Sequence, residues 1–202
     1  MVMDEGEQVS ERELRSLIRA SHPAFREAVV ADAQVTARYR GERSEFSSGA
    51  DAAIQAARLA LVSDGFLGQV LYRAKARLQS LGVPLLPRLF HRAAMALSQV
   101  AIGDPVVVEP GVYLVHGQVV VDGIVTIGSG TVIAPFTTIG LRAGDLLGPR
   151  VGRNVTIGTG AKVIGPVALG EGCTVGANAV VVGDVPSGRT VAGVPARPVG
   201  GS

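Results

Sequence analysis

One histidine, His116, interrupts the valine-rich stretch GVYLVHGQVVVDG, which runs from Gly111 to Gly123. The chain contains only three histidines, so a histidine inside so apolar a pattern needs an explanation. A neutral imidazole is suited to general-base work, because its pKa lies close to physiological pH. A base of this kind also needs a partner that holds its ring in one tautomer and one orientation. The alternative interpretation is a polar residue that is tolerated where the chain bulges.

The segment around His116 belongs to a repeat with a period of six. An aliphatic residue recurs along it at Ile102, Val108, Leu114, Val121, Ile127, Ile133, Ile139, Val151, Ile157, Val163, Leu169, Val175 and Val181. Glycine often follows this residue, and the position four later is mostly small or β-branched. Such a period, with two inward positions and a turn glycine, is typical of a parallel β-helix. The single cysteine, Cys173, falls on an inward small position, so we interpret it as a core residue, and no intramolecular disulfide is possible.

Two irregularities interrupt the repeat. Leu114 and Val121 are seven residues apart, and the extra residue lies in VHGQ, beside His116. Ile139 and Val151 are twelve residues apart, but the intervening GLRAGDLLGPR has no second hexad, which predicts an extruded loop. The regular faces of a repeat fold are committed to packing, so irregular segments are where function is expected.

Residues 1–100 have a helical pattern instead. The first predicted helix has Ser21 as its N-cap, Pro23 in its first turn and Gly41 as its stop, and the second ends near Gly65. The fourth covers about 88–100, and the first dozen residues are expected to be disordered. In the third helix, one apolar face is predicted from Leu67, Val70, Leu71, Ala74, Leu78 and Leu81.

Composition excludes several classes of protein. No run of 18 apolar residues is present, so no transmembrane helix is predicted, and the acidic N-terminus has no apolar signal-peptide core. The expected compartment is therefore the cytoplasm. A net charge of +2 and 4% aromatic residues argue against nucleic-acid binding, and no metal-ligand spacing is present. Residues 66–99 contain bases but no acid, which indicates a helix face that pairs with acids elsewhere, or a face for an anionic ligand or a membrane surface.

From about Gly65 to Gly200 the sequence resembles the serine acetyltransferases, within the hexapeptide-repeat acyltransferases. DGFLGQVLYR is similar to that family's Gly-Phe-x5-Tyr-Arg helix, and the run from IGTGAKVIGP to AGVPARPVG is similar to its C-terminal coils. The resemblance implies an all-α N-terminal oligomerisation domain (1–100), a left-handed parallel β-helix acyltransferase domain (101–186) and a C-terminal tail (187–202). It also implies a homotrimer or a dimer of trimers.

The resemblance further implies an acyltransferase that uses acetyl-CoA or another acyl-CoA bound between neighbouring β-helices, with no metal. His116 matches the family's histidine that deprotonates the acceptor hydroxyl, which then attacks the thioester. The residues that match the family's contacts to coenzyme A are Gly140, Leu141, Thr159, Ala177 and Arg197, and Lys162 is a further candidate cation.

The departures from the family concern charged residues around the acceptor. The acid that orients the family's histidine falls on Ala101, and the aspartate before that histidine falls on Val115. The second histidine and its preceding arginine fall near Gly148 and Leu147, and a helical-domain acid is matched only loosely, by Asp51. Because an unpaired buried charge costs several kcal/mol, a zwitterionic amino acid fits such a site poorly. We therefore expect a small-molecule acceptor that is larger or less charged than free serine, or one presented on a carrier.

Several alternatives stay open at this point. The orienting partner of His116 could be Asp104, Glu109, Asp122 or Asp145, from this chain or a neighbouring subunit, or it could be a backbone carbonyl. These acids could equally be solvent-facing residues at β-helix corners. The chain could be a genuine serine O-acetyltransferase with a rebuilt catalytic dyad. It could also be a catalytically silent homologue that serves as a scaffold or partner subunit.

Overall fold

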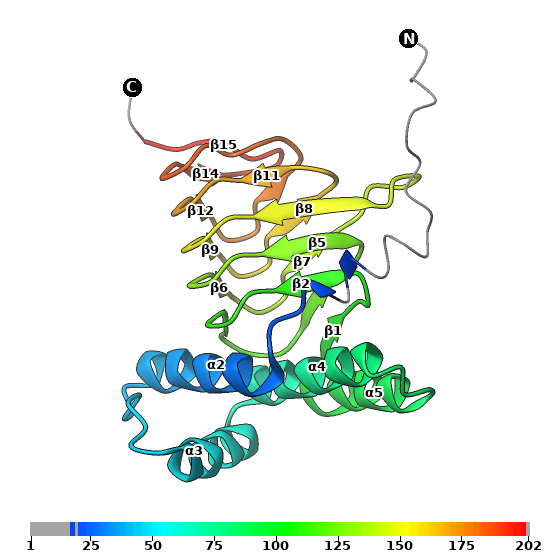
Figure 1. The fold of residues 1–202 in the computed structure, drawn as a ribbon. Helices are drawn as coiled ribbons and strands as arrows, with labels where there is room; N and C mark the ends of the chain where they lie inside the picture. Colours follow the sequence, from blue (N-terminus) through cyan, green and yellow to red (C-terminus); the bar gives the residue numbers. More distant parts are fainter. Residues whose placement is uncertain (1–16, 19, 201–202) are drawn as a thin grey trace.

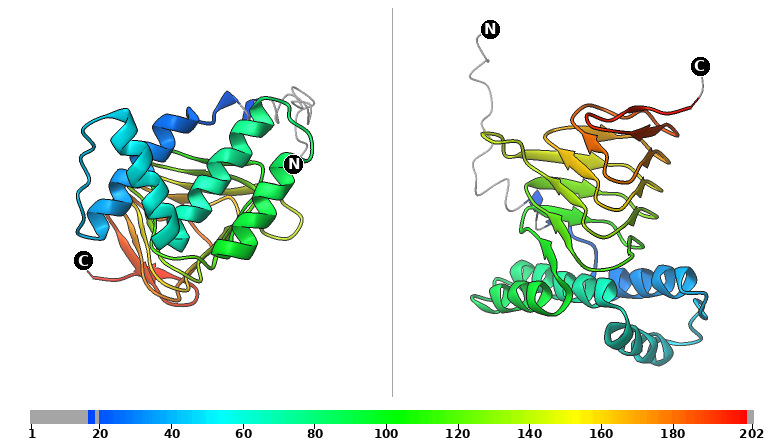
Figure 2. Two further views of the ribbon diagram at one scale, coloured as in Figure 1. Left: turned by 90° about the horizontal axis from the view of Figure 1, so that it is seen from below. Right: turned by 180° about the vertical axis from the view of Figure 1, so that it is seen from behind.

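The computed structural model describes residues 17–18 and 20–200, and it shows a β-solenoid with a layer of helices across one end (Figure 1). The helices are α2 (Phe25–Tyr39), α3 (Gly49–Val62), α4 (Asp64–Ser80) and α5 (Leu86–Ser98). Figure 2 shows α4 running beneath the solenoid next to α5. The predicted class, a left-handed parallel β-helix with an all-α N-terminal domain, is confirmed. No helix in the described part of the chain is both long and apolar enough to cross a bilayer.

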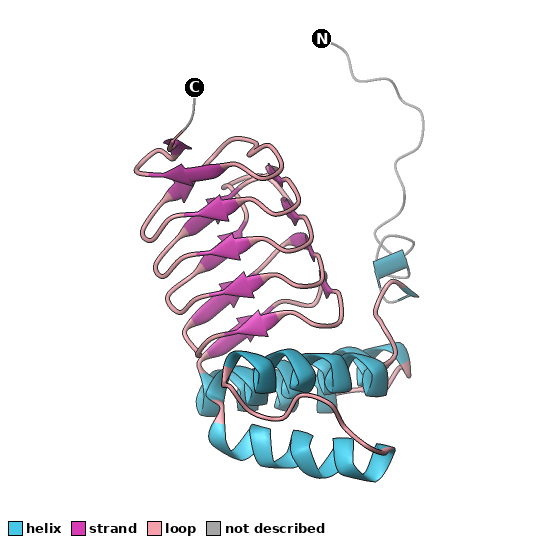
Figure 3. Cartoon of the chain, turned by 90° about the vertical axis from the view of Figure 1, so that its left-hand side faces the viewer, coloured by secondary structure: helices cyan, strands magenta, loops and turns pink. Residues whose placement is uncertain are grey.

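Each coil adds one strand to each of three parallel sheets, so the solenoid is triangular in section. Figure 3 shows the strands of successive coils stacked along one side of it. The first sheet contains β1 (Val100–Ile102), β4 (Val119–Val121), β7 (Thr138–Gly140), β10 (Lys162–Ile164) and β13 (Val180–Val181). The second contains β2 (Val106–Val108), β5 (Ile124–Ile127), β8 (Leu147–Val151) and β11 (Ala168–Leu169). The third contains β3 (Tyr113–Leu114), β6 (Val132–Ile133), β9 (Thr156–Ile157), β12 (Thr174–Val175) and β14 (Thr190–Ala192), and β15 (Arg197–Pro198) closes it antiparallel to β14.

Strand register confirms both irregularities of the repeat. Partners in regular coils are eighteen residues apart, as in Ile157 with Val175. The spacing rises to nineteen across VHGQ, where Ile102 pairs with Val121. It rises to twenty-four across the predicted loop, where Ile127 pairs with Val151. Because three hexads complete one coil, inserted residues must leave the wall of the solenoid at these two places.

The hexad residues fill the solenoid interior as predicted. Each of the aliphatic positions from Ile102 to Val181 is at most 4% exposed, and Cys173 is completely buried among them. One continuous apolar core therefore runs the length of the coils. The corners between the three sheets carry outward-facing residues.

Helix α4 closes the end of this core in a way that the apolar pattern did not predict. A solenoid end exposes strand carbonyls that have no coil beneath them. Side chains of α4 donate hydrogen bonds to these carbonyls: Gln69 to Val112, Tyr72 to Val106, Arg73 to Val108 and Glu109, and Lys75 to Ile102. The predicted apolar face is only half-buried, and its last member, Leu81, is 59% exposed. The apolar pattern identified the helix and this face, but it did not indicate the polar donors that meet the coil.

Three predicted helix ends also need correction. Ser21 does not cap α2, whose N-cap is Ala24 without a side-chain bond. The second predicted helix, α3, ends at Val62 rather than near Gly65, because the Ser63 hydroxyl accepts from the Phe66 amide and caps α4. Helix α5 ends at Ser98, so Val100 already belongs to β1. The dozen residues expected to be disordered lie outside the described residues.

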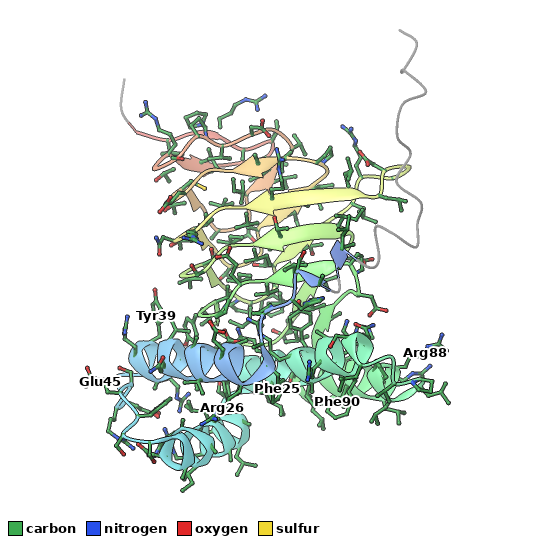
Figure 4. The ribbon with its side chains drawn as sticks, in the orientation of Figure 1. Phe25, Arg26, Tyr39, Glu45, Arg88 and Phe90 are labelled. Atoms are coloured by element: carbon green, nitrogen blue, oxygen red, sulfur yellow. The ribbon has the colours of Figure 1, made fainter. Side chains whose placement is uncertain are left out.

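The acid-free stretch 66–99 contains both buried and exposed bases. Arg73 pairs with Asp32 at 3.0 Å and Lys75 with Asp104 at 3.0 Å, which confirms for these two the predicted pairing with distant acids. Arg88 is exposed instead, at the end of the helical layer opposite Tyr39 (Figure 4).

Candidate active site

His116 lies at the corner between β3 and β4, in contact with the start of α4. Its Nδ1 atom is 3.2 Å from Oδ1 of Asp64, the first residue of α4. The other carboxylate oxygen, Oδ2, accepts the Gly117 amide at 3.0 Å. Oδ1 also accepts the amide of Gly65 at 2.9 Å. One aspartate thus ties the histidine, the bulged corner and the helix start together.

Two glycines, Gly65 and Gly117, allow the start of α4 to lie close to the corner that carries His116. A Cβ atom on Gly65 would lie 2.4 Å from the Leu114 carbonyl oxygen, which is too close for any side chain. A Cβ atom on Gly117 would lie 1.9 Å from the carbonyl oxygen of Ser98. The extra residue of VHGQ therefore brings the backbone into direct contact with the ends of both α4 and α5. Helix and corner can approach closely only because both positions lack a side chain.

The surroundings of Asp64 keep it ionised. Partial burial by itself would raise the pKa of this carboxyl group, but the amides of Gly117 and Gly65 and the His116 ring outweigh that effect and hold the pKa below its usual value. An ionised carboxylate only accepts hydrogen bonds, so the hydrogen between the two groups belongs to Nδ1 of His116. The neutral ring then carries its lone pair on Nε2.

A cavity of about 310 Å³ opens beside this pair. It is lined by Asp64, Leu97, Ser98, Gln99, His116, Gly117, Gln118, Pro135 and Phe136. These residues include no lysine or arginine. The histidine side chain is 66% exposed and the aspartate side chain 46% exposed, so both are open to a ligand.

One side of the cavity is formed by residues whose backbone has the left-handed conformation and which stack at one corner of successive coils. Gln99, Gln118 and Phe136 have φ values of 53°, 62° and 61°, which are uncommon for residues other than glycine. They occupy equivalent corner positions before β1, β4 and β7. Gly160 and Asn178 continue this column, which we call the corner column, before β10 and β13, also with positive φ. Strained backbone conformations of this kind concentrate at functional sites.

None of the four acids proposed from the sequence contacts His116 within this chain. Each is bonded elsewhere: Asp104 to Lys75, Glu109 to the Ser129 amide and Arg153, Asp122 to the Gly123 amide, and Asp145 to the Leu147 amide. The loosely matched Asp51 is also bonded elsewhere, to Arg43 and to the amide of Ser47. Sequence reasoning missed Asp64, although the acid stands immediately before the Gly-Phe pair of the family-like helix, in SDGF.

The residues matched to coenzyme A contacts lie on two different corners of the chain. Thr159 and Ala177 are exposed on successive turns of the corner column, where the Asn178 amide donates to the Thr159 carbonyl at 2.8 Å. The Lys162 ammonium bonds the carbonyl oxygen of Phe136, which links it to the cavity wall.

Of the other matched residues, Gly140 and Leu141 are not at this corner within one chain, whereas Arg197 pairs with Ala192 where β14 leads into it. Gly140 is the last residue of β7, at the opposite corner of the first sheet, and Leu141 packs over Gly123 there. Arg197 is exposed on β15, at the far end of the solenoid from the helices.

Comparisons with known proteins agree with this fold. The family model for the bacterial transferase hexapeptide (six repeats) matches residues 148–183. A serine acetyltransferase from Synechocystis sp. is 42% identical over 139 residues, which are 67% of this chain and 55% of that protein. The chain thus spans about half the length of the curated relatives it matches.

Solved structures resemble the chain over nearly its whole length. A serine acetyltransferase in complex with CoA is 27% identical with a TM-score of 0.72, and the match covers 95% of this chain and 76% of that one. The Neisseria gonorrhoeae serine acetyltransferase in complex with serine is 25% identical with a TM-score of 0.74, covering 96% and 78%.

Proposed function

The chain is a serine acetyltransferase-like member of the hexapeptide transferase superfamily, and from that kinship we propose that it transfers an acyl group from acyl-CoA, with acetyl-CoA the first candidate, to an acceptor hydroxyl. The observation that carries the proposal is the His116–Asp64 pair, open to a cavity on the corner column. A lone histidine at a tolerated bulge would not need a carboxylate on one nitrogen and a cavity beside it.

In the proposed reaction His116 is the general base. The Nε2 lone pair accepts the proton of the acceptor hydroxyl as its oxygen attacks the carbonyl carbon of the thioester. The resulting tetrahedral intermediate collapses by breaking the carbon–sulfur bond. The departing sulfur then takes the proton from Nε2, so the products are the acyl ester and free CoA thiol. His116 returns to its starting neutral form.

We place the acyl-CoA along the corner column. Thr159 and Ala177 would meet the pantetheine arm, and Lys162 would lie between that arm and the cavity. Gly140 and Leu141 would contribute from the opposite corner of the first sheet, which requires a groove between neighbouring copies in a trimer or dimer of trimers. Arg197 would contribute from the last coil, on the same corner as Ala177. The CoA complex of a relative with this fold supports the choice of co-substrate.

The cavity favours an acceptor without a free carboxylate. Its lining includes no cation, and its one acid is already engaged by two amides and by His116. The side-chain amides of Gln99 and Gln118 suit neutral hydrogen-bonding groups instead. We therefore propose a neutral hydroxyl compound, free or presented on a carrier.

The second candidate is serine O-acetylation. It is favoured by the names of the relatives and by Asp64, which rebuilds an acid–histidine pair. The two candidates differ in whether the acceptor carries a carboxylate that the cavity must neutralise.

The test is release of CoA thiol from acetyl-CoA by the purified protein, alone, with L-serine, and with a panel of neutral alcohols and sugars. We expect acceptor-dependent release with members of the neutral panel. It should disappear in His116→Ala and persist in His91→Ala, a matched loss of a half-buried histidine on α5. Release with serine alone would favour the second candidate.

Absence of release with every acceptor would count against enzymatic activity. Calorimetry with CoA then separates two explanations. Retained binding of CoA means that the acceptor panel is incomplete, and loss of binding favours the silent scaffold.

A further inference from the structure

We propose that Asp64 is the positioning residue of His116, so that the helical layer rather than the β-helix supplies the acid of this pair. This inference rests on the proposed role of His116 as base. It assigns a function to a residue at the start of α4, 52 positions away from the histidine in sequence. The positions where the family resemblance would place such an acid hold Ala101 and Val115, which cannot accept a hydrogen bond through their side chains.

The carboxylate of Asp64 is held in place by backbone amides as well as by the His116 ring. The Gly65 amide fixes one oxygen from within α4, and the Gly117 amide fixes the other from the bulged corner. The Ser63 cap fixes the start of the helix itself, through the Phe66 amide. The aspartate is therefore already oriented before the ring of His116 approaches it, which is what a positioning group requires.

The histidine has no comparable support of its own. Its side chain is 66% exposed, and the hydrogen bond to Asp64 is its one side-chain bond among the described residues. Without the carboxylate, an exposed neutral imidazole would divide between its two tautomers and several rotamers. Only the tautomer protonated on Nδ1 leaves Nε2 free to act as a base.

The charge of Asp64 suits this role across the relevant pH range. Its pKa is held below the usual range for a carboxyl group, chiefly by backbone amides that overcome the effect of burial. The carboxylate thus remains an acceptor at every pH at which an imidazole can be neutral.

A competing role must be separated from positioning. Asp64 lines the cavity, so its carboxylate could instead bind a cationic group of the acceptor. In that case its loss would raise the KM for the acceptor and leave kcat and the histidine tautomer unchanged. A positioning role predicts the reverse, because the reacting nitrogen itself becomes misplaced.

The first experiment reads the tautomer directly and needs no acceptor. Long-range ¹H–¹⁵N spectra of the imidazole nitrogens are recorded for the full-length protein and for Asp64→Asn. The chain has only three histidines, so His22→Gln and His91→Gln identify the His116 signals. We expect the Nδ1–H tautomer in the wild-type protein and a mixture of both tautomers in Asp64→Asn. An unchanged tautomer population in the variant overturns the proposal.

The second experiment measures acyl transfer with the acceptor found above. We expect Asp64→Asn to lower kcat by about 10²-fold, the scale of a misplaced catalytic group, with little change in the KM for acetyl-CoA. Asp64→Glu keeps the charge and should recover part of that loss.

The matched control is Asp51→Asn. It removes an aspartate from the first turn of another helix, α3, where the side chain also accepts a backbone amide but does not line the cavity. It should retain wild-type kcat. Thermal unfolding of each variant identifies losses that come from folding, and Asp64→Glu then carries the test if Asp64→Asn does not fold.

The outcomes of the two experiments are distinct. A wild-type kcat in Asp64→Asn, or a rise in acceptor KM alone, overturns the positioning role and leaves the proposed function intact. A tautomer change in a protein whose wild-type form neither transfers an acyl group nor binds CoA overturns the proposed function and leaves the positioning of His116 by Asp64 intact.

Discussion

Replacing Tyr72 by phenylalanine tests whether α4 stabilises the fold by capping the open end of the solenoid. The Tyr72 hydroxyl donates to the carbonyl of Val106 at 2.7 Å, and the side chain is only 3% exposed. Phenylalanine keeps the ring against which the charged groups of Arg73 and Lys75 lie, each 5.6 Å from its centre. The substitution therefore removes one hydrogen bond and little else.

The expected cost follows from the burial of the carbonyl that loses its partner. Val106 is completely buried at the first coil, so neither water nor another coil can replace the hydroxyl. Leaving a buried acceptor unsatisfied costs about 1–3 kcal/mol of unfolding free energy. For a chain of this length, each 1 kcal/mol corresponds to a fall of about 2–4 °C in Tm.

Urea unfolding followed by circular dichroism measures this change. We expect a lower midpoint with an unchanged slope, because the surface exposed on unfolding stays the same. Tyr39→Phe is the matched control, because Tyr39 is 55% exposed at one end of the helical layer (Figure 4). Its ring stacks on that of Tyr113, with 4.5 Å between the ring centres, and phenylalanine keeps this contact. It should change stability by less than about 0.5 kcal/mol. Equal midpoints for the two variants would refute the idea that donors on α4 hold the end of the solenoid.

Two further predictions concern the corner at His116. Gly117→Ala would place a Cβ atom 1.9 Å from the Ser98 carbonyl oxygen, so we expect a loss of about 1–3 kcal/mol in urea unfolding together with loss of acyl transfer. Gly183→Ala, where a Cβ atom meets nothing within 4 Å, is its control, and wild-type stability and transfer in Gly117→Ala would contradict the close packing. The second prediction concerns the stability of the protein at low pH. The pKa of Asp64 is lower in the folded than in the unfolded protein, so its ionised carboxylate stabilises the fold. This contribution is present above the unfolded pKa of about 4 and is lost as the pH falls through the folded pKa. The urea midpoint of Asp64→Asn should therefore decline less steeply below about pH 4 than that of the wild-type protein, and parallel declines would contradict the assignment.

Much of the β-helix could be predicted from the sequence because its rule is local. Each coil repeats an aliphatic residue inside and a turn at the corner. The spacing alone therefore predicts that Ile102, Val121 and Val181 are buried. The same regularity exposed the two interruptions, and one of them contains His116. A family resemblance in the same segments then suggested what that histidine does.

The buried face of α4 could not be predicted in this way. Apolar periodicity identified a leucine face, but α4 also meets a solenoid end whose unpaired carbonyls need donors. Gln69, Arg73 and Lys75 are consequently buried, although residues of these types are usually exposed.

The sequence by itself determined the repeat, the core and the position of the histidine. Only the tertiary structure decided which acid reaches that histidine. Acids near His116 in sequence are bonded elsewhere, whereas Asp64 arrives from another layer of the fold. The physical reason is that the partner of the His116 side chain depends on where α4 docks across the first coil. This docking depends on Gly65 and Gly117, because only glycine at these positions lets the backbone of the corner approach the helices.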